Sequence, residues 1–69
     1  MANNQKIKIK MLENNINNYT ELAEKLNTNR QNVYNKLKNR TKWNYNDIQK
    51  LIFLLNLTPD DVFEIFFKG

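Results

Sequence analysis

The sequence lacks the residues that most often cross-link small proteins or build reactive centres in them. Its 69 residues include no cysteine and no histidine, one glycine and one proline. Without cysteine there is no disulfide, and without either residue the usual ligands of a structural zinc site are missing. The fold must therefore be stabilised by helix packing or by a partner chain. Because the commonest general bases and nucleophiles are also absent, we expect no enzyme, no metal site and no cofactor.

Long apolar runs are missing as well. The longest, LIFLL at residues 51–55, is far shorter than the roughly 20 residues that a membrane-spanning helix needs. No charged stretch followed by an apolar one marks a signal peptide at the N-terminus. We therefore expect one domain over residues 1–69, no membrane segment and a cytoplasmic location.

Positive charge is present, and it is concentrated in the middle of the chain. The net charge is +4, yet residues 25–46 contain six lysines and arginines and no acid. Residues 1–24 are balanced, and residues 47–69 carry a charge of −2. Such a local excess is typical of a surface that binds a polyanion. A solvated basic face without a ligand has the same composition and remains the alternative.

Capping residues and apolar spacing predict five helices and therefore an all-α bundle. The expected helices span about residues 4–14, 19–26, 30–39, 45–55 and 59–67. Asn18, Asn29 and Asn44 are the expected N-caps of the second, third and fourth helices. Thr58 followed by Pro59 marks the start of the fifth. Asn27, between the second and third helices, is expected to take the left-handed conformation that ends a helix. A compositional bias towards asparagine is an alternative explanation for the clusters of this residue.

The first helix is the least certain of the five. KIKIK at residues 6–10 alternates with period two, so a strand is an alternative there. If the segment is helical, its buried face carries either Ile9, Leu12 and Ile16 or Ile7 and Met11. The positions expected to be buried in the other four helices are Leu22, Ala23, Leu26, Val33, Leu37, Ile48, Leu51, Ile52, Leu55, Val62, Ile65 and Phe66.

Three aromatic residues allow two interpretations each. Trp43 either places its N–H at a phosphate or covers the core, and its position before the fourth helix favours core cover. Phe63 and Phe67 lie at i and i+4 on a second face of the last helix. They form either an interface with a second copy of the chain or a contact with the first helix.

The segment YTELAEKLNTNRQNVYNKLKNR, residues 19–40, resembles the helix-turn-helix of Cro- and repressor-type phage and plasmid regulators. The matching features are the pair Leu22-Ala23, then Leu26, the turn, the cap at Asn29, and Val33 with Leu37. YNDIQKLIFLLNLTPDDVFEIFF at 45–67 is similar to the fourth and fifth helices of short Gram-positive phage regulators. The resemblance covers about residues 18–67. It implies a compact lambda-repressor-like bundle of five helices with the helix-turn-helix at 19–39.

The resemblance implies that the helix over 30–39 lies in the major groove, with its N-terminal residues at base edges. The side chains expected to contact bases are Arg30, Gln31, Tyr34 and Asn35. Arginine pairs with guanine, and glutamine or asparagine pairs with adenine. The residues expected to contact phosphates are Tyr19, Thr20, Asn29, Lys36, Lys38, Arg40, Lys42 and Asn44. In this segment Asn27 stands where glycine is usual, and Tyr19 stands where a phosphate-binding glutamine is common.

Each of these residues also has an ordinary structural explanation. Arg30 suits the first turn of any helix, Tyr34 can pack against the preceding helix, and capping alone explains Asn44. The expected function is a sequence-specific transcriptional regulator that binds double-stranded operator DNA, as a homodimer through Phe63 and Phe67, at the nucleoid of a bacterial cell. One alternative is a small protein that acts through a protein partner, as antitoxins and phage inhibitors of host defence do. The other is DNA binding without sequence preference.

Overall fold

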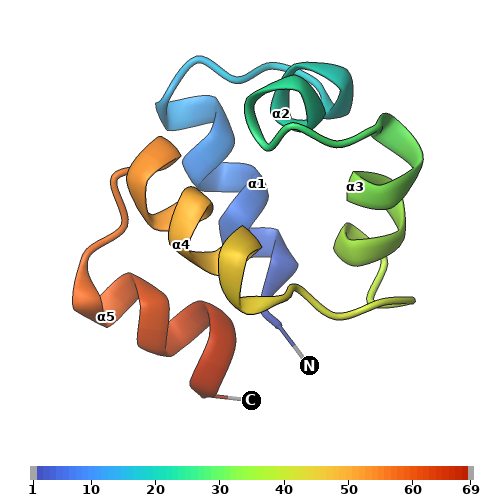
Figure 1. Cartoon of the computed structure of the whole chain (residues 1–69). Coiled ribbons are helices and arrows are strands. Elements are labelled where there is room, and N and C mark those ends of the chain that lie inside the picture. Colours follow the sequence, from blue (N-terminus) through green and yellow to red (C-terminus); the bar gives the residue numbers. More distant parts are fainter. Residues whose placement is uncertain (1, 69) are drawn as a thin grey trace.

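The structure, a computed structural model, describes residues 2–68. Figure 1 shows α1 running through the middle of the molecule, with α2 and α3 on one side and α4 and α5 on the other. The elements are α1 (Asn4–Glu13), α2 (Tyr19–Lys25), α3 (Arg30–Leu37), α4 (Tyr45–Leu54), α5 (Pro59–Val62) and the π-helical turn η1 (Phe63–Phe67). Because α5 continues directly into η1, the described residues form five helices and no strand. The prediction of an all-α, five-helix bundle is confirmed.

The strand alternative for residues 6–10 is wrong. Asn3 caps α1 by accepting a hydrogen bond from the Lys6 N–H, and the helix runs through the whole KIKIK segment. Ile7 and Met11, one turn apart, are buried, whereas Ile9 and Leu12 are exposed. Ile16 is also buried, but from the loop that follows the helix.

Asparagine begins the first four helices. In each N-cap the side-chain oxygen accepts from the backbone N–H three residues later, which satisfies one of the unpaired donors at a helix start. The four caps are Asn3, Asn18, Asn29 and Asn44. The Asp47 carboxylate accepts in return from the Asn44 N–H, which completes a capping box. The predicted caps of α2, α3 and α4 are confirmed.

Asparagine also ends these four helices. Asn15, Asn27, Asn39 and Asn56 have φ values between 51° and 61°. In each case the next residue donates its N–H to the carbonyl five positions earlier, as Thr28 does to Ala23 at 2.9 Å. This is the Schellman arrangement, in which asparagine replaces the usual glycine. Eight of the 14 asparagines therefore have a defined place at a helix end, which explains how the chain needs only one glycine.

The same arrangement corrects four predicted helix ends. The third helix ends at Leu37 and not at Asn39, because Lys38 is the C-cap and Asn39 is left-handed. The first, second and fourth helices likewise end one residue earlier than expected, with Asn14, Leu26 and Leu55 as C-caps.

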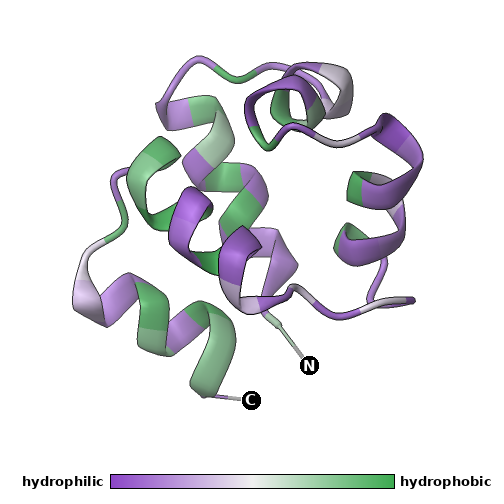
Figure 2. Ribbon diagram, in the orientation of Figure 1, coloured by the Kyte–Doolittle hydropathy of each residue, from purple (hydrophilic) through white to green (hydrophobic). Residues whose placement is uncertain are grey.

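The core lies between α1 and the inner faces of the other helices, where Figure 2 shows the apolar side of each ribbon. Its members with the lowest exposure are Ile7, Leu22, Val33, Leu51, Leu55 and Ile65. The predicted core positions Ile48, Ile52, Val62 and Phe66 are half-buried and pack on its edge. Trp43 is buried and donates its ring N–H to the Asn4 side chain at 3.0 Å, so core cover is the correct interpretation.

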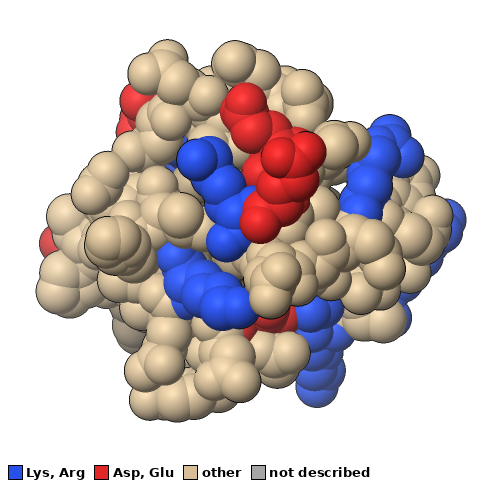
Figure 3. All heavy atoms as spheres, turned by 45° about the horizontal axis from the view of Figure 1, so that its top comes forward, with Lys and Arg blue, Asp and Glu red and all other residues tan. Residues whose placement is uncertain are grey.

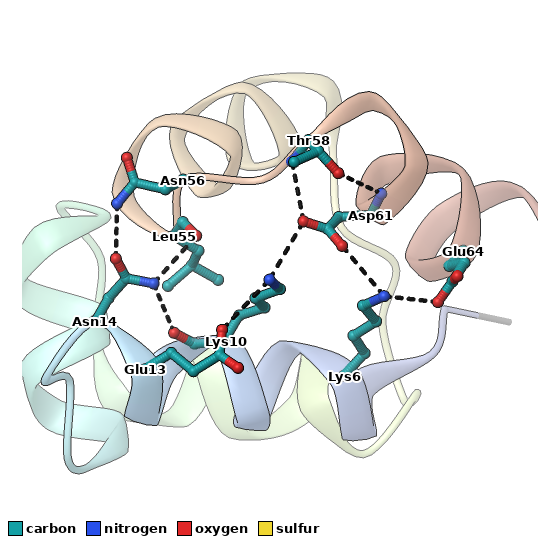
Figure 4. Close-up of polar contacts among 9 residues, drawn as sticks. All are labelled: Lys6, Lys10, Glu13, Asn14, Leu55, Asn56, Thr58, Asp61 and Glu64. Carbon is teal, nitrogen blue, oxygen red and sulfur yellow. Dashed lines mark hydrogen bonds and ion pairs between the residues drawn. The ribbon is translucent and has the colours of Figure 1, made fainter.

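Ion pairs fasten α5 to α1 (Figure 4). The Asp61 carboxylate lies 3.1 Å from the Lys6 ammonium and 3.4 Å from that of Lys10. Lys6 also donates to Glu64 at 2.6 Å. Asp61 accepts the Thr58 N–H at 3.0 Å in the capping box of α5. This backbone hydrogen bond, aided by the two lysines, lowers the pKa of Asp61 well below its usual value. Asp61 and Glu64 of the last helix thus pair with Lys6 and Lys10 of α1.

Replacing Asp61 with asparagine should change how stability depends on pH. The depressed pKa means that the folded state binds the proton of Asp61 less readily than the unfolded state, in which it titrates near pH 3.9. The stabilisation is therefore complete above about pH 4 and is lost as the pH falls through the folded-state pKa. We expect Asp61→Asn to lower the melting temperature at pH 7 and to flatten its decline between pH 4 and 2. Asp60→Asn, an exposed neighbour, is the control, and parallel curves for wild type and Asp61→Asn would contradict the assignment.

Candidate nucleic-acid interface

The site is built on the packing of α2 against α3. Ala23 is only 2% exposed, and it lies with Leu22 and Leu26 in the same core cluster as Val33 of α3. The left-handed Asn27 reverses the chain, and Asn32 donates from its amide to the Thr28 hydroxyl at 2.8 Å across the turn. The buried side chains and the turn together fix the angle between the two helices, and they leave the other face of α3 to solvent.

The outward face of α3 carries amide and guanidinium groups. Arg30 and Gln31 are exposed in its first turn, and Asn35 follows one turn later, half-buried. The Gln31 amide donates to the Asn35 side-chain oxygen at 3.1 Å, so the two carboxamides lie side by side. Figure 2 shows this face as the hydrophilic side of α3. Donors and acceptors of this kind match the edges of base pairs in the major groove.

Tyr34 is the centre of an aromatic and basic cluster. Its ring centroid lies 6.3 Å from that of Tyr19 on α2, so it packs against the preceding helix as one interpretation expected. The Lys38 ammonium and the Arg40 guanidinium each lie 5.6 Å from the Tyr34 centroid. Cations at this distance from an aromatic face are attracted by it. The cluster places three predicted phosphate contacts, Tyr19, Lys38 and Arg40, next to the predicted base contact Tyr34.

Lys36 is occupied inside the molecule. Its ammonium pairs with the Asp47 carboxylate of the α4 capping box and lies 5.7 Å from the centroid of the Trp43 ring. Only 17% of its side chain is exposed. The sequence predicted a phosphate contact for Lys36 and gave no sign of its pairing with Asp47, which lies eleven residues later in the first turn of α4.

The other predicted phosphate contacts remain at the surface on both sides of α3. Among residues 2–68 no ion pair is formed by Lys38, Arg40 or Lys42, nor by Arg30, which is a predicted base contact. Thr20, Asn29 and Asn44 are exposed at helix starts, where backbone N–H groups also point outward. In Figure 3 the edge of the molecule that carries α3 in Figure 1 shows basic atoms and no acidic ones. The surface can attract and hold a polyanion.

One buried residue next to this surface was missed. Asn4 is 6% exposed, and its carboxamide joins the start of α1 to the end of α3 and to Trp43. Its place on the buried stripe of α1, with Ile7 and Met11 at i+3 and i+7, was the available signal. A polar residue at such a position has to find hydrogen-bond partners inside the protein.

None of the helices formed by residues 2–68 has the length and apolar character needed to cross a membrane. Comparison with curated proteins and with solved structures gave no significant match. A family model described as the Cro/C1-type HTH DNA-binding domain matches residues 6–68. The match takes in α2, its turn, α3 and all the basic residues of the surface described above. The chain therefore belongs to the Cro/C1-type helix-turn-helix family of DNA-binding domains.

Proposed function

We propose that the protein is a sequence-specific transcriptional regulator that binds operator DNA with α3 in the major groove. The observation that carries the proposal is the outer face of α3, which presents amides and a guanidinium group and no acid while its inner face is fixed in the core. In this proposal Arg30 and Gln31, the most exposed of the four, reach base edges first. Asn35 and Tyr34 complete the reading surface.

The phosphate contacts lie on both sides of this helix. We assign them to Tyr19, Thr20, Asn29, Lys38, Arg40, Lys42 and Asn44. Lys36 receives a different role, because its ammonium is paired with Asp47 and fixes α3 to the start of α4. Phosphate contacts of this kind set affinity and orientation but carry no sequence information. Occupation of an operator would then block or redirect RNA polymerase at the nucleoid, with the whole chain acting as one domain and without a cofactor.

Selection from random double-stranded oligonucleotides, followed by sequencing of the bound fraction, tests the proposal. We expect an enriched motif, and an affinity for it that exceeds that for scrambled DNA by at least about 1,000-fold at physiological salt. Salt-sensitive binding to all sequences alike would favour a DNA-binding role without sequence preference. No binding to DNA at any salt concentration would overturn the proposal and favour action through a protein partner.

The protein should act as a symmetric dimer on DNA. One recognition helix covers only a few base pairs, and a twofold axis would place a second α3 about one helical turn, or roughly 10 base pairs, away. Phe63 and Phe67 are 56% and 68% exposed on one side of η1, which suits a surface covered by a second copy.

Sedimentation with and without the selected DNA checks the dimer and its interface. We expect two chains per DNA for the wild type and one, with weaker binding, for Phe67→Lys. Phe53→Lys is the matched control, because Phe53 is 77% exposed on α4 and carries the same change of charge. One wild-type chain per DNA at saturation would rule out the dimer. A Phe67→Lys protein that still binds as two chains would place the interface elsewhere.

A further inference from the structure

The buried Asn4 side chain is hydrogen-bonded to residues on both sides of the segment that carries the proposed phosphate contacts Arg40 and Lys42. Its amide nitrogen, which carries two hydrogens, donates to three acceptors, one hydrogen being shared: the carbonyls of Lys36 at 2.9 Å and Leu37 at 3.0 Å, and the Asn39 side-chain oxygen at 3.1 Å. Its oxygen accepts the Trp43 ring N–H at 3.0 Å. Because the indole nitrogen is only a donor and a carbonyl is only an acceptor, these partners fix which way the carboxamide points.

These partners hold both ends of the segment that joins α3 to α4. The Lys36 and Leu37 carbonyls are the last two of α3, and Asn39 is the left-handed residue that ends the helix. Trp43 is the residue before the N-cap of α4. Between Asn39 and Trp43 lie three exposed residues, Arg40, Thr41 and Lys42, of which two are basic.

We propose that Asn4 is the positioning residue of the phosphate-contacting segment 40–42. Its side chain is hydrogen-bonded to both Asn39 and Trp43, so the backbone of Arg40 and Lys42, which lie between them, is held in a defined position next to the end of α3. A segment of three residues with both ends fixed loses little entropy when it meets DNA, since most of its ordering is already done. The inference rests on the proposed DNA-binding function, and it adds a residue on α1 that touches no DNA.

Asn14 at the other end of α1 offers a matched control. Its amide donates to the carbonyls of Lys10 at 2.8 Å and Leu55 at 3.1 Å, and its oxygen accepts from Asn56 at 2.7 Å (Figure 4). Asn56 is the left-handed residue that ends α4, just as Asn39 ends α3. The two asparagines therefore play the same structural part at opposite ends of one helix, but only Asn4 is joined to the basic segment.

The test compares Asn4→Leu with Asn14→Leu in the full chain. Leucine keeps the approximate size, removes the hydrogen bonds and adds no charge. Binding to a duplex of fixed sequence is measured from 50 to 200 mM salt at a low temperature, where circular dichroism shows each variant to be folded. For Asn4→Leu we expect a slope of log affinity against log salt that is shallower by about 1 to 2, because up to two phosphate contacts are lost. For Asn14→Leu we expect the wild-type slope.

Hydrogen exchange of backbone amides gives a second readout. In Asn4→Leu the Arg40 amide, which donates to the Asn35 carbonyl at 2.9 Å, should exchange faster. In Asn14→Leu the faster exchange should appear instead at the Leu57 amide, which donates to the Ile52 carbonyl at 3.0 Å. A purely structural role for Asn4 predicts a lower melting temperature with an unchanged salt slope in the folded variant, and that result overturns the inference.

Two further outcomes remain distinguishable. If the wild type shows no salt-dependent DNA binding, the proposed function fails, whatever Asn4 does. If Asn4→Leu does not fold in the cold, Trp43→Phe tests the same link, since it removes the N–H that Asn4 accepts and keeps a ring in the core. Its slope should be shallower than that of Asn14→Leu, and a wild-type slope would overturn the inference.

Discussion

Arg30→Ala is expected to weaken binding to the selected DNA by about 1–3 kcal/mol and to relax preference at one base position. Arg30 is exposed in the first turn of α3 and forms no ion pair with the described residues, so its guanidinium is available to a guanine. The N-cap hydrogen bond, which the Asn32 N–H donates to the Asn29 side-chain oxygen, remains in the variant, so α3 should keep its start. The measurement is a titration on the selected site and on versions with each base pair changed.

Lys38→Ala is the control for this prediction, because it removes one positive charge at the opposite end of α3, away from the first turn that is assigned to base edges. Lys38 is the C-cap of α3, and its ammonium lies over the Tyr34 ring. We expect it to weaken binding to all sequences alike and to make the salt dependence shallower by about 1. Base readout by Arg30 would be wrong if both variants lowered affinity equally on matched and scrambled DNA.

Local signals predicted most of the fold. Asn18, Asn29, Asn44 and Thr58 act as the predicted N-caps because each bond involves residues only three positions apart. The spacing of Leu22, Leu26, Val33 and Leu37 placed the inner faces of α2 and α3 correctly, since periodicity reports which side of a helix is buried. The left-handed Asn27 was predicted from the same local chemistry, and it shows that the missing glycine leaves the turn intact.

The electrostatic part of the site was predicted less well, because it depends on contacts distant in sequence. Counting charges along the chain could not reveal that Lys36 pairs with Asp47 or that Lys6 pairs with Glu64, 58 residues away. Nor could helical periodicity show that Asn4 would find acceptors at the end of α3. Such pairs form only once helix packing has brought the elements together. Of the basic residues at 36–42, Lys36 is therefore paired within the fold, whereas Lys38, Arg40 and Lys42 form no ion pair with residues 2–68.

Ala23→Leu should destabilise the fold by about 1–3 kcal/mol, because three extra carbons would have to fit where α2 meets α3. Ala23 is 2% exposed, and its carbonyl accepts the Thr28 N–H that closes the turn, so neither the side chain nor the backbone can move aside freely. For a domain of this size, each kcal/mol of destabilisation lowers the melting temperature by about 4–8 °C.

Thermal unfolding by circular dichroism measures the effect of Ala23→Leu. The control for adding a leucine is Gln5→Leu, at an exposed position on α1. DNA affinity of the folded variant should fall as well, since a larger residue there changes the angle at which α2 presents α3. An unchanged melting temperature would mean that α2 and α3 do not meet at Ala23, and the face assigned to DNA would then be wrong.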